Sequence, residues 1–597
     1  MLCYSEWMKK YKTQWDLALL YKSPKDPQIE KDIQSIEKLC DTLAKKYKDK
    51  KFIQSPELLY SALEDIEKTA SSVNESKPLF YFWLQTELNS SDAIVKAALQ
   101  STEQRLTVAG NKLIFFELTV ASISLKDQKK FLEYPKLKKY KYLLEKTFLL
   151  SKFNLSEKEE QLLGLLSQPS FSMWTQATDQ LLHKKTVLFK KKNIPISEAT
   201  DILPDLSTKD RLYLYKEIVR VCKDVASIAE PELNAIGTYK KIVEQQRGFE
   251  APYQSQMISH ELDEGVVSAL VSLTTKYFSV SKKFYSLHKK LLNLSSLGYQ
   301  DRSAHIGKVK KKFSFDEAVS IVKNSFSSID QKYVLIFEKF LKDGQIDVYP
   351  RKGKKGGGFC ASVLGTPTFI LLNYTKDIRS VETIAHEMGH AFHIHFSKTQ
   401  PPHYSHYPMS TAEVASTFFE NGILDILYEK LSTKEKIVFL HSKLLSDITT
   451  VFRQIACFNF ENEFHITLKQ KGYLSSVEIQ KIMIKHMSAY LGPSFKLTED
   501  DGLDYVRWMH LRMFFYTISY TFGFLVSKAL YENYKKDPLY IKKVEQFLSS
   551  GASMSPKDIF KKMGIDITDP KFFESGLKAI DADITKLEKL AKKAKLI

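Results

Sequence analysis

Residues 383–396, TIAHEMGHAFHIHF, bring histidine and glutamate together at a spacing that suits a metal ion. His386, Glu387 and His390 form the pattern H-E-x-x-H. On an α-helix, residues four apart share one face, so both imidazoles can reach one zinc ion and the glutamate beside the first can touch a metal-bound water. The alternative is an amphipathic helix with incidental histidines, because a pattern with three fixed positions also arises by chance.

A catalytic zinc ion normally has three protein ligands and a water molecule, so a third ligand is needed. The metzincin pattern would place a histidine ten residues after His386, where this chain has Phe396, and is therefore excluded. His393 lies one turn beyond His390, but three ligands on one straight helix would spread over about 10 Å. We expect His393 to pack beside the ligands. Surface positions are expected for the other histidines of this region, His395, His403 and His406.

A carboxylate from a second helix is the remaining option for the third ligand. Between Ala391 and Ala412 there is no Asp or Glu, and the first acidic residue after the motif is Glu413. The same residue closes a capping-box pattern that begins at Ser410, in which the glutamate would bond to the start of its own helix. These two roles compete for the same oxygen atoms. We favour the metal ligand, with Glu420 as the alternative ligand.

Helices must position most of these residues. In residues 27–49 and near the C-terminus, apolar residues recur at spacings of three and four, which marks one buried helix face. These residues are Ile29, Ile33, Ile36, Cys40, Leu43 and Tyr47, then Ile580, Ile584, Leu587 and Ala591. Residues 366–374, after a Gly-rich turn, resemble a strand. The two prolines and capping residues of 191–211 predict a boundary between an N-terminal helical part and a larger second half.

The composition is that of an ordinary globular protein of 597 residues, with a net charge of +18 from 88 Lys and Arg against 70 Asp and Glu. The basic residues lie on helix-like faces without interleaved aromatics, so we expect a solvated surface and no nucleic-acid partner. No segment approaches the ~18 apolar residues of a membrane span, and the first residues do not resemble a signal peptide. Five scattered cysteines favour a reduced protein, and we expect a cytoplasmic location.

Two neighbouring segments, HEMGHAFH and AEVASTFFE, resemble the oligoendopeptidase F branch of the M3 zinc metallopeptidases, the relatives of thimet oligopeptidase. The segments YPRKGKKGGGF, WMHLRMFFYTISYTFG and SPKDIFKKMGIDITDPKFFESGLKAI also resemble parts of that family. YKSPKDPQIEKDI and LSEKEEQLLGLLSQPSFSMWTQATDQL resemble its N-terminal parts, so the resemblance covers nearly the whole chain. It implies a mainly α, elongated all-helical zincin with a small β-sheet beside the active site and a deep substrate channel. It also implies an N-terminal helical region at 1–110, an oligoendopeptidase F-type helical domain at 111–195 and a catalytic domain at 205–590.

The resemblance also implies roles for single residues. One zinc ion would be held by His386, His390 and Glu413, with Glu387 as the general base. His510 and tyrosines near it would face the zinc and bind the substrate carbonyl, and the matching tyrosines are Tyr516 and Tyr520. This chain departs from the family pattern at Arg512, where relatives often have tyrosine, and at Ile518, which leaves the identity of the catalytic tyrosine open.

The expected function is therefore hydrolysis of internal bonds in short unstructured peptides by a monomeric zinc enzyme. Two other functions remain open. A zinc exopeptidase of the carboxypeptidase type would need a basic group that grips the terminal carboxylate, and Arg512 could be that group. A basic helical binding protein with a vestigial metal site is the second alternative, although all the expected catalytic residue types are present.

Overall fold

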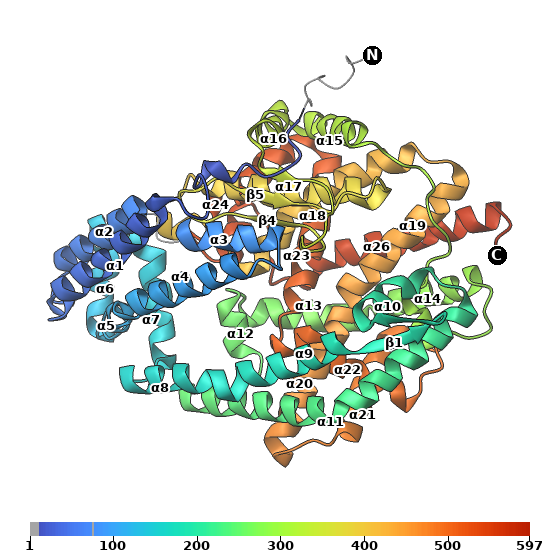
Figure 1. Cartoon of the computed structure of the whole chain (residues 1–597), viewed down its shortest axis with the longest axis horizontal. Helices are drawn as coiled ribbons and strands as arrows, with labels where there is room; N and C mark the ends of the chain where they lie inside the picture. Colours follow the sequence, from blue (N-terminus) through green and yellow to red (C-terminus); the bar gives the residue numbers. More distant parts are fainter. Residues whose placement is uncertain (1–10, 74–76) are drawn as a thin grey trace.

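The computed structural model describes residues 11–73 and 77–597, and it is mainly helical (Figure 1). The helices of the N-terminal part are α1 (Pro27–Tyr47), α2 (Pro56–Val73), α3 (Lys77–Leu88), α4 (Ala93–Asn111), α5 (Ile114–Ala121), α6 (Leu125–Glu133), α7 (Lys141–Leu150), α8 (Glu157–Ser167) and α9 (Met173–Lys184). In Figure 1, α1 and α2 lie at one end of the molecule and the C-terminus lies at the other.

The remaining helices form the larger part of the chain. They are α10 (Ile196–Ile202), α11 (Thr208–Arg247), α12 (Gln254–Ser259), α13 (Glu264–Lys276), α14 (Phe278–Leu291), α15 (Phe315–Ile329), α16 (Gln331–Asp343), α17 (Ile378–Ser397), α18 (Met409–Glu429), α19 (Thr433–Ile448), α20 (Gln454–Lys471), α21 (Ser476–Leu491), α22 (Asp504–Arg507), α23 (Ile518–Lys536), α24 (Ile541–Ser550), α25 (Pro556–Lys562) and α26 (Pro570–Lys593). The mainly α-helical fold predicted from the sequence is confirmed.

The two helices with the clearest apolar stripes form as predicted. Helix α1 begins at Pro27 after Asp26, whose side chain accepts a hydrogen bond from the Gln28 amide and so caps the helix. Every residue of the predicted stripe, from Ile29 to Tyr47, is buried. In α26 the residues Ile580, Ile584, Leu587 and Ala591 are buried in the same way.

The predicted boundary at 191–211 contains regular structure. Strands β1 (Thr186–Phe189) and β2 (Lys192–Pro195) form an antiparallel hairpin, and α10 follows directly. Lys190 and Lys191 adopt left-handed φ angles of 48° and 66°, which a two-residue hairpin turn requires. Ser207 then caps the 40-residue helix α11 by accepting from the Asp210 amide. A two-stranded sheet in this segment was not predicted from the sequence.

A second small sheet lies directly before α17. Its order is β3 (Ile346–Asp347), β5 (Phe369–Leu371), β4 (Phe359–Ala361), with β3 parallel and β4 antiparallel to β5. The strand predicted at 366–374 is therefore shorter and central. Pro367 has no N–H for a ladder bond, and the Thr366 hydroxyl bonds back to the Val363 carbonyl at 2.9 Å, so a turn occupies the start of the predicted strand.

The N-terminal part packs against this sheet through Trp15, which precedes the first helix, and through α3. The Phe369 ring packs edge-on against Trp15, with ring centres 5.7 Å apart, and tilted against Phe80 of α3 at 6.2 Å. The Trp15 indole also donates to the Ile370 carbonyl at 2.7 Å. Strand β4, at the edge, contacts α17. The N-terminal part thus fixes the position of β4 beside the helix that carries H-E-x-x-H.

The main apolar core runs from α9 to α26, with smaller clusters among the N-terminal helices. Within residues 11–73 and 77–597, no single helix is long and apolar enough to cross a membrane. One pair, Ala93–Ala121 with Leu125–Glu133, meets the length and composition criteria together but is bent by 99° at its break.

Candidate active site

Two adjacent helices, α17 and α18, carry the H-E-x-x-H motif and the carboxylate after it. Asp377 caps α17 by accepting from the Ser380 amide at 2.8 Å. The apolar residues beside the two histidines, such as Ala385 and Met388, are fully buried, so the helix has one fixed rotation. At Gly389 a Cβ atom would lie 2.6 Å from Ser416 Cα of α18, which is closer than any side chain allows. The glycine lets the two helices meet backbone to backbone.

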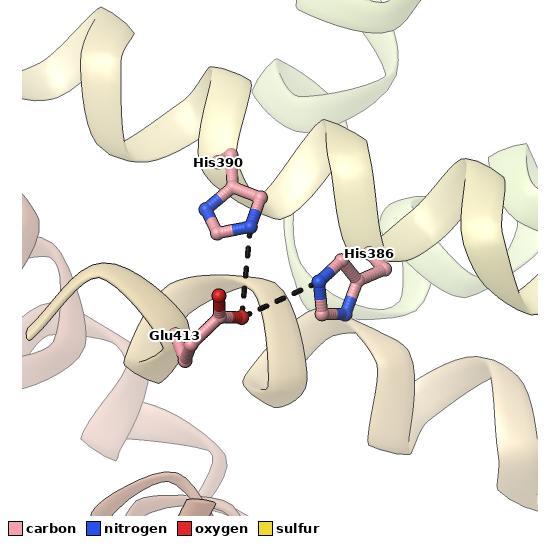
Figure 2. Close-up of side chains that lie close together, drawn as sticks. All are labelled: His386, His390 and Glu413. Carbon is pink, nitrogen blue, oxygen red and sulfur yellow. Dashed lines mark ion pairs between the residues drawn. The ribbon is translucent and has the colours of Figure 1, made fainter. Parts of the chain in front are cut away.

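His386 and His390 project from α17 toward Glu413 on α18 (Figure 2). One carboxylate oxygen of Glu413, Oε2, lies 3.4 Å from His386 Nε2 and 3.7 Å from His390 Nε2, and all the ligand atoms fall within 4.8 Å of one another. Zinc bonds of about 2.0–2.2 Å at tetrahedral angles place ligand atoms roughly 3.3–3.6 Å apart. The side chains are 14–29% exposed, so a ligand set of the right size faces solvent.

The capping-box alternative for Glu413 does not form. Helix α18 begins after Pro408, and no side chain caps it. The Ser410 hydroxyl instead donates to the His260 carbonyl at 2.7 Å. The Glu413 carboxylate accepts a bond from the Ser416 hydroxyl at 2.9 Å and points to the two histidines. Its oxygens are therefore available to a metal ion.

Glu420, the alternative ligand, has a supporting position. Its Oε2 lies 2.8 Å from Nδ1 of His386, on the side of the ring away from Glu413. A hydrogen bond there places the proton on Nδ1 and leaves Nε2 with its lone pair for a metal ion. Glu420 therefore orients His386 and does not join the set of ligand atoms.

Burial and mutual charge set the pKa values of these groups. Burial raises the pKa of Glu387 to about 7, with a further increase from Glu413 and Glu420 that His386 opposes. Burial lowers the pKa of His390 to about 4. Burial alone would lower the pKa of His386 and raise that of Glu413. The nearby carboxylates instead hold the pKa of His386 well above its ordinary value, and the histidines lower that of Glu413 to about 2. The His386 ring lies between the carboxylates of Glu413, on the Nε2 side, and Glu420, on the Nδ1 side, and both stabilise its protonated form. A metal cation bound at Nε2 would replace the proton there.

The other histidines of the motif region do not join this set. His393 is buried and stacks on Tyr407 with ring centres 3.8 Å apart, as expected for a packing residue. His395 and His406 are exposed, as expected. His403 differs from the expectation, because it is half-buried against Tyr140 with ring centres 5.0 Å apart.

The Gly-rich segment contacts the proposed base. A Cβ atom at Gly358 would lie 3.2 Å from Glu387 Oε1 and 3.0 Å from Thr383 Cγ2. Strand β4 begins at the next residue, so its backbone runs beside the Glu387 carboxyl group. This role of Gly358 was not predicted from the sequence. The neighbouring run of glycines offers the sequence signal, because glycine is common where another group must approach the backbone closely.

The segment 508–520 brings the aromatic residues together. His510 and Tyr516 lie nearly parallel with ring centres 5.9 Å apart, and Tyr520 stands edge-on to both at 5.8 and 5.4 Å. Burial, with Tyr516 and Glu413 nearby, raises the pKa of Tyr520. Three residues further along α23, a Cβ atom at Gly523 would lie 2.8 Å from Glu413 Cβ. Tyr520 is thus on the face of α23 that meets Glu413.

Two further residues, one beside the candidate ligands and one that binds Arg512, were not predicted from the sequence. Tyr407 precedes α18, and burial raises its pKa, as do the charges of Cys360, Glu413 and Glu387 near it. The Glu232 carboxylate of α11 accepts two hydrogen bonds from the Arg512 guanidinium, of 3.0 Å from Nε and 2.7 Å from Nη2. Glu232 could not be found from a local pattern, because Arg512 is 280 positions away in the sequence.

The fold and the site define a helical metallopeptidase, and the comparisons agree. The sequence model of peptidase family M3 matches residues 219–579, more than half of the chain. The model described as oligopeptidase F matches residues 120–184. The chain belongs to peptidase family M3. It is 24% identical to oligopeptidase PepF of Bacillus subtilis, over 97% of this chain and 88% of that protein. It is 25% identical to an oligoendopeptidase F homolog of Borreliella burgdorferi, over 96% and 98%.

Solved structures share the fold. A Chlamydophila abortus protein described as a peptidase superposes with a TM-score of 0.81 at 22% identity, over 96% of this chain and 98% of that one. Oligoendopeptidase-F from Enterococcus faecium superposes with a TM-score of 0.72 at 18% identity, over 95% and 99%. The resemblance to the oligoendopeptidase F branch, stated from the sequence, is confirmed.

Proposed function

We propose that this chain is a zinc-dependent oligoendopeptidase that cleaves internal bonds of short unstructured peptides. The observation that carries the proposal is the convergence of His386, His390 and Glu413 on one point beside the buried carboxyl group of Glu387. Two imidazoles and one carboxylate are a typical ligand set of catalytic zinc. Membership of peptidase family M3 supports the reaction class.

Glu387 is the proposed proton carrier of the reaction. Zinc, held by His386, His390 and Glu413, would act as a Lewis acid and make water nucleophilic at neutral pH. Glu387 would accept the proton of the attacking water and deliver it to the leaving amine. Burial favours the protonated form of Glu387, which suits delivery of the proton, and a bound cation would favour the carboxylate that accepts it.

The aromatic cluster supplies candidate donors for the oxyanion that forms on the carbonyl. His510, Tyr516 and Tyr520 have ring centres within 5.9 Å of one another. Donors that are in place before the reaction stabilise the developing charge without reorganisation. We assign this role to His510 with one or both tyrosines.

Strand β4 is the proposed binding surface for the peptide backbone. It is an edge strand, and Gly358 at its start lies against Glu387. An extended peptide that adds to such an edge gains main-chain hydrogen bonds without a strict requirement for side chains. The central strand β5 has β3 and β4 on its two sides and cannot take this role.

Arg512, the basic group that a carboxypeptidase would need for the terminal carboxylate, is already bound within the protein. Arg512 is 3% exposed, and its guanidinium is engaged by both oxygens of Glu232 and by the Tyr505 carbonyl. It is therefore not available to a peptide carboxylate. We further propose that the enzyme acts as a cytoplasmic monomer, without a nucleic-acid or membrane partner.

Peptides with blocked ends test the function directly. The purified protein is incubated with acetylated and amidated peptides of about ten residues, with the same peptides unblocked, and with a folded protein, and the products are identified by mass spectrometry. We expect internal cleavage of both peptide sets at similar rates, loss of cleavage with a chelator and recovery with zinc. Cleavage of unblocked peptides alone would establish an exopeptidase, and no cleavage with zinc would favour the binding protein.

A further inference from the structure

The chain enters the aromatic cluster through an unusual backbone conformation. Phe514 and Phe515 have φ angles of 43° and 53°, and Tyr516 follows directly. Left-handed conformations cost free energy for residues with a side chain and persist only where the surroundings enforce them. Among the described residues, the other consecutive non-glycine pair of this kind is Lys190–Lys191, in an exposed hairpin turn. The phenylalanine pair has no such turn to explain it.

Buried contacts hold this pair in place. Phe515 is fully buried, and its ring packs against Phe458 and His465 of α20, with ring centres 5.2 and 5.5 Å away. Its backbone amide donates a hydrogen bond of 2.7 Å to Oε1 of Glu461, also on α20. Glu461 is 2% exposed. The amide of a left-handed residue therefore ends on a buried carboxyl group from another helix.

Glu461 is a costly residue for this position. Burial raises the pKa of its carboxyl group to about 8, although the Phe515 amide, Lys240 and Cys457 oppose the increase. The Cys457 thiol, 3.9 Å from Oε2, is a weak donor. An apolar side chain would fill the space without desolvating a polar group. The feature that Glu461 provides and an apolar residue cannot is the acceptor for the Phe515 amide.

We propose that Glu461 is a positioning residue that fixes the backbone at Phe515 and thereby holds the Tyr516 hydroxyl where it serves the reaction. This inference rests on the proposed role of Tyr516 in the function above. Glu461 itself belongs to α20 and is no part of the ligand set on α17 and α18. Its effect should therefore fall on turnover and leave metal content unchanged.

Two substitutions separate the hydrogen bond from the packing. Glu461→Met fills a similar volume without an acceptor, and Glu461→Gln keeps an acceptor oxygen. We expect kcat to fall about tenfold in Glu461→Met, with KM and bound zinc within about twofold of the original protein, and kcat within about twofold in Glu461→Gln. Amide hydrogen exchange of the peptide 513–517 should become faster in Glu461→Met and stay slow in Glu461→Gln.

A matched control uses a similar buried bond that does not involve the segment 508–520. Asn234 of α11 is 4% exposed, and its side-chain oxygen accepts from the Leu474 amide at 2.8 Å, in the loop between α20 and α21. Asn234→Leu should lower thermal stability and leave kcat unchanged. A drop in kcat equal to that of Glu461→Met would mean that any loss of a buried bond in this part of the molecule affects turnover, and it would overturn the proposal.

A double-mutant cycle with Tyr516→Phe tests the path of the effect. If Glu461 acts through the Tyr516 hydroxyl, Glu461→Met should change kcat less than about twofold once that hydroxyl is absent. Additive losses overturn the proposal, and so does an equal loss in Glu461→Gln and Glu461→Met. If Tyr516→Phe alone leaves kcat unchanged, both the role of Tyr516 and this inference fail. The zinc-dependent peptidase function would still stand on cleavage by the unaltered protein.

Discussion

The ligand helices and the aromatic segment reach the same site by different means. The ligands lie on two regular helices, α17 and α18, which meet backbone to backbone at Gly389. The proposed aromatic donors lie on the segment 508–520, where the chain has no α-helix until α23 begins at Ile518, and buried groups of α11 and α20, such as Glu232 and Glu461, hold this segment. Helix periodicity sets the spacing of the ligands, whereas contacts between residues far apart in sequence set that of the donors.

The two regions should therefore respond differently to substitution. Substitutions on α17 and α18 should alter metal binding or proton transfer directly, because side chains of these two helices form the proposed ligand set and the proposed base. Changes in the aromatic segment should alter turnover while the metal stays bound.

Removing the proton acceptor should have the largest effect. In Glu387→Gln the side chain keeps its size but cannot take a proton, so we expect kcat to fall about 10³- to 10⁴-fold. Zinc content, measured by elemental analysis, should be unchanged, because Glu387 is not in the ligand set. Cleavage near the original rate would remove Glu387 from the role of general base.

Removing the third ligand should release the metal. In Glu413→Ala the two histidines remain without the carboxylate, and we expect zinc affinity to fall more than about 100-fold, beyond the usual effect of losing a supporting residue. Competition with a coloured chelator measures this affinity. The matched variant Glu420→Ala removes only the partner of His386 Nδ1 and should cost about 10- to 100-fold. Equal losses in the two variants would contradict the assigned difference between ligand and supporting residue.

Removing one phenol should affect turnover alone. We expect Tyr516→Phe or Tyr520→Phe to lower kcat about 100-fold, the effect of losing one oxyanion donor, with zinc content unchanged. A smaller loss in one of the two variants would identify the main donor. Loss of zinc from either variant would break the division between the two regions.

Closing the space at Gly389 should affect the ligand helices as a unit. We expect Gly389→Ala to lower the free energy of unfolding by about 1–3 kcal/mol through overpacking, and to weaken zinc binding with it. Gly110→Ala in α4 is the control, because a Cβ atom there meets nothing within 4 Å. Thermal unfolding and chelator competition measure the two effects. Normal zinc affinity in a destabilised Gly389→Ala protein would separate packing from metal binding.

The same difference between the ligand helices and the aromatic segment explains which residues of the site could be predicted from the sequence. The spacing of His386 and His390, and the gap without carboxylates before Glu413, depend on helix geometry and short chain separation, and the structure brings these residues together. The aromatic residues could be named by family resemblance, but their supports could not. Glu232 lies 280 positions from Arg512 and Glu461 lies 54 from Phe515, so no local pattern connects them.

The small β-structure was the least predictable part of the fold. Apolar and β-branched residues suggested a strand over 366–374, yet the ladder retains only Phe369–Leu371, between a turn and the approach to α17. The hairpin β1–β2 depends on left-handed lysines, which no residue preference favours. Whether a short segment forms a strand depends on the strand that pairs with it, and a single sequence does not show which segments pair.

The two glycine contacts of α18 have a consequence for moving this site into another protein. Gly389 of α17 lies directly against Ser416, and Gly523 of α23 lies directly against Glu413. Copying the H-E-x-x-H motif and its glutamate onto another helix bundle would therefore transfer the ligands without their spacing. A designer would need to graft three helices with both glycines, since the gap that each glycine leaves is narrower than one methyl group.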